Sequence, residues 1–316
     1  MDRERYEICY ENLRKREQKN IDLNRYWYTE LRPVFAEMES IPYAIIKGEV
    51  LSIKSYGDVG FRSCGDIDFL IPREYVPKVV AIFKKNGFVE NLYDSNGKPR
   101  KISRKEQIMF MNSHQIVPLV KNRGSLKEIP VDINVDIFWG EYTGKKIDIN
   151  LFLEDTESIT LYDSQIKILP DIKCFFEVCL HHYKEMQAPY YLTMANPFTE
   201  KMFQDIYGMY KRSIFKVIDK LADYVYRNQA EKIFYYIFYY TSWVFNDEAM
   251  YLDGERFKTE EGEEQLDCFG LTEQERKKWP IPFKERMNHR NIFNVVETCL
   301  SKRDIEKIEM VLSIFM

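Results

Sequence analysis

Two segments in the first half of the chain alternate between apolar and polar residues. In residues 130–139, aliphatic side chains occupy every second position and polar ones lie between them, namely Val131, Ile133, Val135 and Ile137 against Asp132, Asn134 and Asp136. In residues 65–71, Asp66 and Asp68 alternate with apolar residues in the same way. Because side chains on a strand point alternately to opposite faces, both segments are predicted to be strands with an apolar back and a carboxylate front.

Shorter patterns predict the other elements of the first half. Residues 1–40 carry apolar residues at helical spacing, and Pro42 ends that helix. Further along we expect a buried strand at 43–46, a two-turn helix at 49–56, a glycine-containing loop at 57–65, an amphipathic helix at 74–86 closed by Gly87, and strands at 88–93, 107–111 and 114–120 with a hairpin turn at 94–98.

The pattern changes to helices in the second half of the chain. Helical spacing covers residues 171–184, 201–211, 214–226, 230–245 and 292–315, whereas residues 246–285 are polar and their acidic stretch at 260–264 is predicted to be a solvated loop. A mixed sheet region followed by an all-helical region predicts an α+β fold. We expect three parts, a helical extension at 1–40, a mixed sheet domain at 41–155 and a helical domain at 156–316.

Composition and charge narrow the function classes. The 316 residues are 45% hydrophobic and 30% charged, as in a globular protein. The net charge of −4 provides no overall basic field, which argues against a general nucleic-acid binder. The six cysteines form no Cys-x-x-Cys pair and are predicted to be free thiols. The chain shows no signal segment and no membrane span, so a cytoplasmic location without a membrane partner is expected.

Asp66, Asp68 and Asp132 are candidate metal ligands. They converge if their two strands are neighbours, and clustered carboxylates repel one another unless a cation lies between them. Three such groups suit two Mg²⁺ ions about 3.5–4 Å apart, the arrangement used in nucleotidyl transfer, with Mn²⁺ as an alternative ion. An Asp-x-Asp pair alone is more typical of a solvated strand edge or a helix-capping turn, and it is the surrounding residues that favour a metal site. Asp136, on the same strand face as Asp132, is the rival third ligand.

The segment before these acids resembles a known family. A strand ending in Lys47-Gly48, then Tyr56, Asp58 and Arg62 before the acidic strand 65–71, looks like the signature of the uncharacterised nucleotidyltransferase family in the DNA-polymerase-β-like superfamily. The resemblance covers roughly residues 40–215. It implies a small mixed nucleotidyltransferase sheet within residues 41–155, helices behind it and metals on its open face.

The resemblance also implies roles for individual residues. Asp66 and Asp68 would bind both metal ions, and Asp132 would complete the catalytic ion and help to deprotonate the acceptor. Gly48, Lys47 and Arg62 would bind the substrate, with Gly48 allowing close approach of the triphosphate. Two positions depart from the pattern, because Asn134 stands where the family has His and Glu49 stands where the wider superfamily often has Ser.

The helical part carries a weaker likeness. The family shows a histidine-bearing helix followed by an aspartate-bearing helix, and His182 and Asp205 stand at those places. We expect His182 to be structural and bonded to Asp205 or a backbone carbonyl. Lys184 is expected to face solvent.

The leading hypothesis is an Mg²⁺-dependent enzyme that transfers a nucleoside monophosphate from an NTP such as ATP to an acceptor hydroxyl, releasing pyrophosphate. The acceptor is a small molecule, a peptide or tRNA, and the acidic net charge disfavours nucleic acid. The basic residues between 98 and 105 form a candidate phosphate-backbone patch, with a solvated hairpin as the alternative. The second hypothesis is a catalytically silent scaffold of the same fold that binds a nucleotide or a protein. The oligomeric state does not follow from the sequence.

Overall fold

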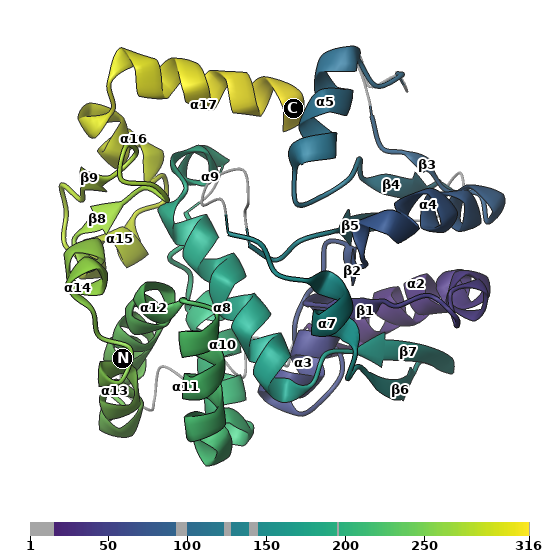
Figure 1. Ribbon diagram of the computed structural model, residues 1–316, viewed down its shortest axis with the longest axis horizontal. Coiled ribbons are helices and arrows are strands. Elements are labelled where there is room, and N and C mark those ends of the chain that lie inside the picture. Colours follow the sequence, from purple (N-terminus) through teal and green to yellow (C-terminus); the bar gives the residue numbers. More distant parts are fainter. Residues whose placement is uncertain (1–15, 93–99, 123–127, 139–144, 195, 316) are drawn as a thin grey trace. The chain divides into compact units, whose positions relative to one another are not determined.

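The computed structural model describes residues 16–92, 100–122, 128–138, 145–194 and 196–315. It consists of two compact units (Figure 1). Among the described residues, the sheet unit runs from residue 16 to Cys174, and the helical unit begins at Phe175. Both predicted carboxylate strands belong to the sheet unit.

One mixed sheet organises the sheet unit. Its strands are β1 (Ala44–Ile46), β2 (Ile67–Leu70), β3 (Val89–Glu90), β4 (Leu119–Lys121), β5 (Ile129–Asn134), β6 (Glu157–Leu161) and β7 (Ser164–Ile168). Within the described residues their order is β3-β4-β5-β2-β1-β7-β6. The central strand β2 pairs antiparallel with β1 and parallel with β5. This parallel pairing places the two carboxylate strands side by side.

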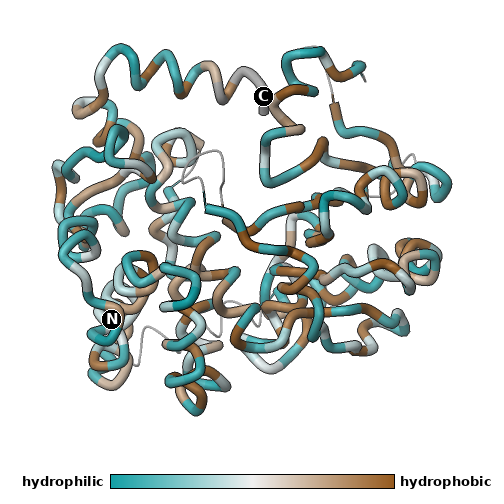
Figure 2. Tube along the Cα trace, viewed as in Figure 1, coloured by the Kyte–Doolittle hydropathy of each residue, from teal (hydrophilic) through white to brown (hydrophobic). Residues whose placement is uncertain are grey.

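The apolar back of the sheet forms the core of the unit. Helices α2 (Glu17–Glu37) and α4 (Val76–Lys85) supply buried side chains that cluster with those of β1, β2, β5 and β7. Phe69 of β2 lies between the two helices, with its ring centroid 5.9 Å from that of Phe35 and 5.4 Å from that of Phe83. In Figure 2 the central strands are correspondingly rich in hydrophobic residues. The predicted alternation of β2 and β5 is therefore confirmed on its apolar side.

The remaining helices of the sheet unit include two that the sequence pattern did not predict, α5 (Arg104–Asn112) and α7 (Ile149–Leu153). The others are α3 (Gly48–Tyr56) and η1 (Arg73–Tyr75). The predicted strand at 107–111 is wrong, because these residues lie within α5. A capping box starts that helix, in which Ser103 accepts from the Glu106 amide and Glu106 accepts from the Ser103 amide. The predicted strand at 114–120 shortens to β4, and the predicted turn at 94–98 lies outside the described residues.

The sheet unit extends beyond residues 41–155 at both ends. Helix α2 buries Leu31 and Val34 completely in the core, so the described part of the predicted extension at 1–40 is integral to the sheet. Strands β6 and β7 follow residue 155, where helices were expected, and Ile168 of β7 pairs with Ile45 of β1. Because β6 and β7 belong to the sheet, the sheet unit continues past residue 155 and ends at Cys174.

Helices dominate the helical unit, with one short ribbon. They are α8 (Asp171–Gln187, which joins this unit from Phe175), α9 (Pro189–Met194), α10 (Glu200–Arg212), η2 (Ile214–Val217), α11 (Ile218–Arg227), α12 (Glu231–Phe245), α13 (Glu248–Glu255), α14 (Glu260–Leu266), α15 (Phe283–Asn288), α16 (Phe293–Val296), η3 (Glu297–Cys299) and α17 (Lys302–Phe315), and the ribbon pairs β8 (Cys268–Phe269) with β9 (Lys277–Lys278). The four helices predicted between 171 and 245 are confirmed, η2 and α11 together replacing the third. The single helix expected at 292–315 is divided.

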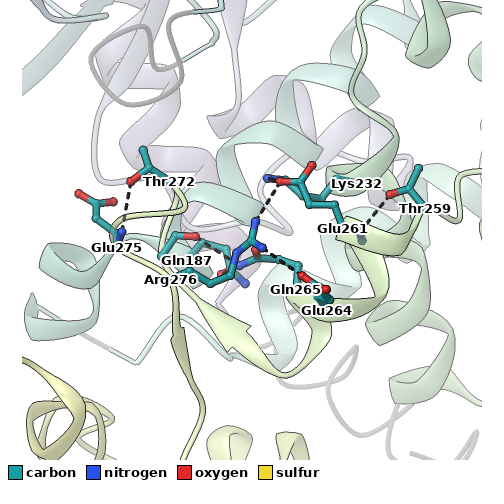
Figure 3. A network of polar contacts seen from close by, with 11 residues as sticks. Gln187, Lys232, Thr259, Glu261, Glu264, Gln265, Thr272, Glu275 and Arg276 are labelled. Carbon is teal, nitrogen blue, oxygen red and sulfur yellow. Dashed lines mark hydrogen bonds and ion pairs between the residues drawn. The ribbon is translucent and has the colours of Figure 1, made fainter.

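The acidic stretch at 260–264 is helical, which corrects the predicted solvated loop. The Thr259 hydroxyl caps α14 by accepting from the Gly262 amide at 3.0 Å. Arg276 donates to Glu261 at 3.0 Å and to Glu264 at 3.2 Å, so its guanidinium pairs with two carboxylates of α14 (Figure 3). Capping and cross-chain pairing offset the repulsion that such a run of carboxylates would otherwise produce.

These features confirm the α+β class, a mixed sheet core with flanking helices followed by a mainly helical region. Within the ranges described, no helix has the length and apolar character needed to cross a bilayer. The cysteines found there are free thiols, namely Cys64, Cys174, Cys179, Cys268 and Cys299.

Candidate active site

Strand register brings the predicted carboxylates together. In the parallel pair of β2 and β5, Asp68 is the direct partner of Asp132. Neighbouring strands lie about 4.8 Å apart, and both side chains project from the face opposite the core. Asp66 immediately precedes β2, and its charge acts on Asp132. The front of the central sheet therefore carries three carboxylates in mutual electrostatic reach.

This concentration of negative charge disfavours ionisation of Asp132. Burial is the largest cause that raises its pKa, and the charges of Asp68 and Asp66 raise it further, to about 7. A hydrogen bond from the Gln115 side chain and the charge of Lys47 act in the opposite direction. The three carboxylates thus carry more negative charge than Lys47 neutralises. Such an excess of negative charge favours the binding of a further positive ion.

Two donors from neighbouring strands contact Asp68. Lys47 directly follows β1, whose Ile46 pairs with Asp68, and its Nζ lies 3.1 Å from Asp68 Oδ1. Asn134, the last residue of β5, donates from Nδ2 to the same oxygen at 3.1 Å. The residue that replaces the expected histidine therefore holds Asp68 in position.

Gly48 places the start of α3 beside the acidic loop. Its φ of 46° lies in the left-handed region, which glycine adopts without steric cost. A Cβ at this position would come within 3.5 Å of Cys64 Sγ and 3.9 Å of the Asp66 carbonyl oxygen. The free amides of the first turn of α3 consequently lie close to the residue that begins the carboxylate cluster.

Glu49 is engaged in the interior of the sheet unit. Its carboxylate accepts from Asn24 of α2 at 2.8 Å, from the Gly60 amide at 2.9 Å and from the Tyr162 hydroxyl. Burial raises the pKa of Glu49, and these hydrogen bonds oppose that effect. The departure from serine at this position therefore has a structural basis, since Glu49 ties α2, the loop at 57–65 and the turn before β7 together.

Arg62 and Asp136 lie at the borders of the cluster. Arg62 is partly buried, its amide donates to the Ser52 hydroxyl at 3.1 Å, and its charge favours the ionised form of Glu49. Asp136 lies beyond the end of β5, and its Oδ1 accepts from the amides of Ile137 and Phe138. Burial raises the pKa of Asp136 to about 6. The register places Asp132, and not Asp136, directly beside Asp68.

Sequence reasoning gave no role to three residues that shape this site. Asn134 shares the polar face of its strand with Asp132, so the alternation itself could have identified it. Gln115 had no such signal, because it lies outside the predicted carboxylate strands and is brought to Asp132 by the pairing of its segment with the end of β5. The buried position of Glu49 depends on contacts with distant segments, and the sequence pattern could not reveal it.

The histidine and aspartate of the helical unit are close to each other. His182 Nε2 lies 3.6 Å from Asp205 Oδ2, and both side chains are buried. The prediction that Lys184 faces solvent is wrong, since only 1% of the residue is exposed and its Nζ donates to the Tyr191 hydroxyl at 2.8 Å.

A mixed sheet that presents clustered carboxylates beside a glycine turn and a helix start is the architecture of a nucleotidyltransferase-like protein. Comparison with family profiles leads to the same class. The profile described as "Uncharacterised nucleotidyltransferase" matches residues 6–246, which is well over half of the chain. The chain belongs to the uncharacterised nucleotidyltransferase family, as its resemblance predicted.

Comparisons with individual proteins add a distant likeness. A crystal structure of an antigenic nucleotidyltransferase-like protein from Paracoccidioides brasiliensis is 12% identical, with a TM-score of 0.34, and the match covers 64% of this chain and 88% of that one. No curated protein matches the chain.

Proposed function

We propose that this protein is an Mg²⁺-dependent enzyme that transfers a nucleoside monophosphate from an NTP, such as ATP, to an acceptor hydroxyl. The observation that carries the proposal is the pairing of Asp68 with Asp132 on adjacent parallel strands, with Asp66 just before them. Membership of a nucleotidyltransferase family supports the reaction class.

The donor set fits Mg²⁺. The three candidate ligands are hard carboxylate oxygens, which Mg²⁺ prefers, and few of them are needed because the ion keeps several waters. Burial, followed by the charges of Asp68 and Asp66, raises the pKa of Asp132 to about 7, and a divalent cation would neutralise those two charges. When bound, two such ions activate an attacking hydroxyl and stabilise the leaving pyrophosphate, with Mn²⁺ as the alternative.

Residues of this chain would position the substrates. The amides at the start of α3, exposed by the absence of a side chain at Gly48, would face the triphosphate, since helix N-termini favour anions. Lys47 would exchange its contact with Asp68 for a phosphate oxygen, and Arg62 would hold a second phosphate group. Asp132 would accept the proton of the acceptor hydroxyl at a carboxylate oxygen.

The acceptor is proposed to be a small molecule or peptide before tRNA. The net charge of −4 disfavours a polyanion. Within the basic segment, Arg100 is already paired with the Glu106 carboxylate, from Nη1 to Oε2 at 2.9 Å and also through Nη2. That pairing reduces the charge which the predicted patch could offer to a phosphate backbone.

Calorimetric titration with each of the four NTPs tests the proposal. We expect binding in Mg²⁺ or Mn²⁺ that EDTA abolishes, and pyrophosphate release when an acceptor mixture is added. Asp66→Asn and Asp68→Asn should lose both, whereas Asp163→Asn, an exposed carboxylate in the turn between β6 and β7, should lose neither. Binding without pyrophosphate release would support the silent-scaffold alternative. If no NTP binds and the Asp66 and Asp68 variants behave like the parent protein, the proposal is wrong.

A further inference from the structure

The helical unit contains a second group of metal-ligating side chains, separate in chemistry from the acidic cluster. His181, His182 and Glu185 lie on α8, and one ligand atom from each lies within 4.8 Å of the others. His181 Nε2 is 3.3 Å from Glu185 Oε1, and His182 Nδ1 is 3.9 Å from Glu185 Oε2. Spacings of three and four residues place Glu185 on the helix face shared with each histidine.

The environment of His182 is unusual for a structural histidine. Its side chain is 3% exposed, and among the described residues neither ring nitrogen has a hydrogen-bond partner. Buried polar groups are nearly always satisfied, because an unsatisfied one costs free energy. Instead, the ring lies between two carboxylates, with Glu185 near Nδ1 and Asp205 3.6 Å from Nε2. The ring is therefore surrounded by the groups that complete a metal site.

We propose that His181 Nε2, His182 Nδ1 and the Glu185 carboxylate bind one transition-metal ion of the zinc class. Two imidazoles and one carboxylate form a donor set that zinc accepts, with a fourth position left for water or another ligand. Imidazole nitrogen is a poor ligand for Mg²⁺, which distinguishes this site from the acidic cluster.

Asp205 has a supporting role in this arrangement. A metal ion on Nδ1 of His182 leaves the proton on Nε2, where it points to Asp205 Oδ2. Metal-bound histidines usually donate their second N–H to a carboxylate, which fixes the ring and its tautomer. The 3.6 Å contact between His182 and Asp205 would therefore have to shorten on metal binding to become the second-sphere hydrogen bond that such a site requires.

Two of the three ligand pairs are near the spacing of a tetrahedral ion, and the third, His181 with His182, lies within 4.8 Å. Zinc ligands at about 2.0–2.2 Å from the ion lie roughly 3.4 Å from one another. The pair of His181 and Glu185 already has a separation of 3.3 Å, and that of His182 and Glu185 must close from 3.9 Å. The side chains of His181 and Glu185 are 15% and 25% exposed, so the site is open to solvent on one side.

The test uses the full-length chain, stripped with EDTA and carrying Asp66→Asn and Asp68→Asn so that the acidic cluster cannot contribute. Titration with ZnCl₂ should give one saturable site. His181→Ala and Glu185→Gln should each weaken the affinity at least about tenfold, and Asp205→Asn by about 10–100-fold. The matched control is His289→Ala, because His289 is exposed and its backbone atoms, which the substitution keeps, make its hydrogen bonds to Glu285 and Asn196. Co²⁺ should produce visible absorption bands of a nitrogen-ligated tetrahedral ion.

A protonated His182 held between two carboxylates without any metal is the rival structure. It predicts no saturable zinc binding, and that result would overturn the proposal. Equal zinc affinity in the parent, His181→Ala and Glu185→Gln proteins would overturn it as well. Circular dichroism verifies folding of each variant, and the Co²⁺ spectrum of the protein with intact His181, His182 and Glu185 gives a decision even if a substitution prevents folding.

Discussion

Replacing Asp132 with asparagine is expected to stabilise the metal-free protein at neutral and alkaline pH. The folded protein raises the pKa of this carboxyl above its unfolded value, so the folded state binds the proton more tightly. As the pH rises from about 4 to about 7, wild-type protein must ionise Asp132 beside Asp68 and Asp66, and it loses stability over that window. Asparagine has nearly the same shape and carries no charge, so the variant avoids this loss.

The magnitude follows from the size of the pKa change. A rise from 3.8 to about 7 corresponds to about 4 kcal/mol at roughly 1.4 kcal/mol per pKa unit. The charges of Asp68 and Asp66 contribute part of this pKa change, and that part is shared among the three carboxylates. The substitution at Asp132 therefore recovers only a portion of the free energy. We therefore expect Asp132→Asn to be about 2–4 kcal/mol more stable than wild type at pH 8, and about equal to it near pH 4.

Urea unfolding in EDTA between pH 4 and pH 8 measures this difference, with hydrogen-exchange protection of β2 and β5 reporting on the sheet unit. Asp163→Asn is the matched control, since it removes an exposed carboxylate at a turn position where asparagine fits the φ of 62°. Its stability curve should follow that of wild type. If Asp132→Asn is less stable at pH 8, or if its advantage does not depend on pH, burial and the neighbouring carboxylates do not disfavour ionisation of Asp132 as described.

Three further substitutions test the local structure. Gly48→Ala should cost about 1–2 kcal/mol in urea unfolding because of its left-handed backbone, and a neutral effect would show that the turn relaxes. Glu49→Ala should cost about 3 kcal/mol and expose the loop at 57–65 to limited proteolysis, since it leaves buried donors unpaired; unchanged cleavage would contradict this role. Thr259→Ala should lower hydrogen-exchange protection of α14 by about 1 kcal/mol through loss of its cap, and Thr259→Ser should retain it.

Local periodicity predicted those parts of the fold in which one face of an element is buried. The alternation in β2 and β5 defined their apolar and acidic faces, and helical spacing located α8, α10, α11 and α12. The apolar run at 107–111 was too short to distinguish strand from helix, and the capping box at Ser103 and Glu106 was the better signal.

Contacts between distant segments account for what the sequence could not predict. Strands β6 and β7 alternate apolar and polar residues, but their place in the sheet depends on the pairing of Ile168 with the distant Ile45 of β1. For the site, alternation identified the three aspartates as candidates but left Asp136 as a rival to Asp132. The register of β5 against β2 distinguishes these two residues, and register depends on the whole sheet.

The pairing of β2 with β5 also bears on the order of events during synthesis. Asn134 and Asp68, which contact each other in the folded protein, are 66 residues apart in the chain. Asp66 and Asp68 therefore leave the ribosome well before the strand that carries Asp132 exists. Parallel strands with such a separation pair slowly, because a long loop must close first. A chain that ends before β5 has only an isolated acidic pair, and the three-carboxylate cluster becomes a marker of the completed pairing of β2 with β5.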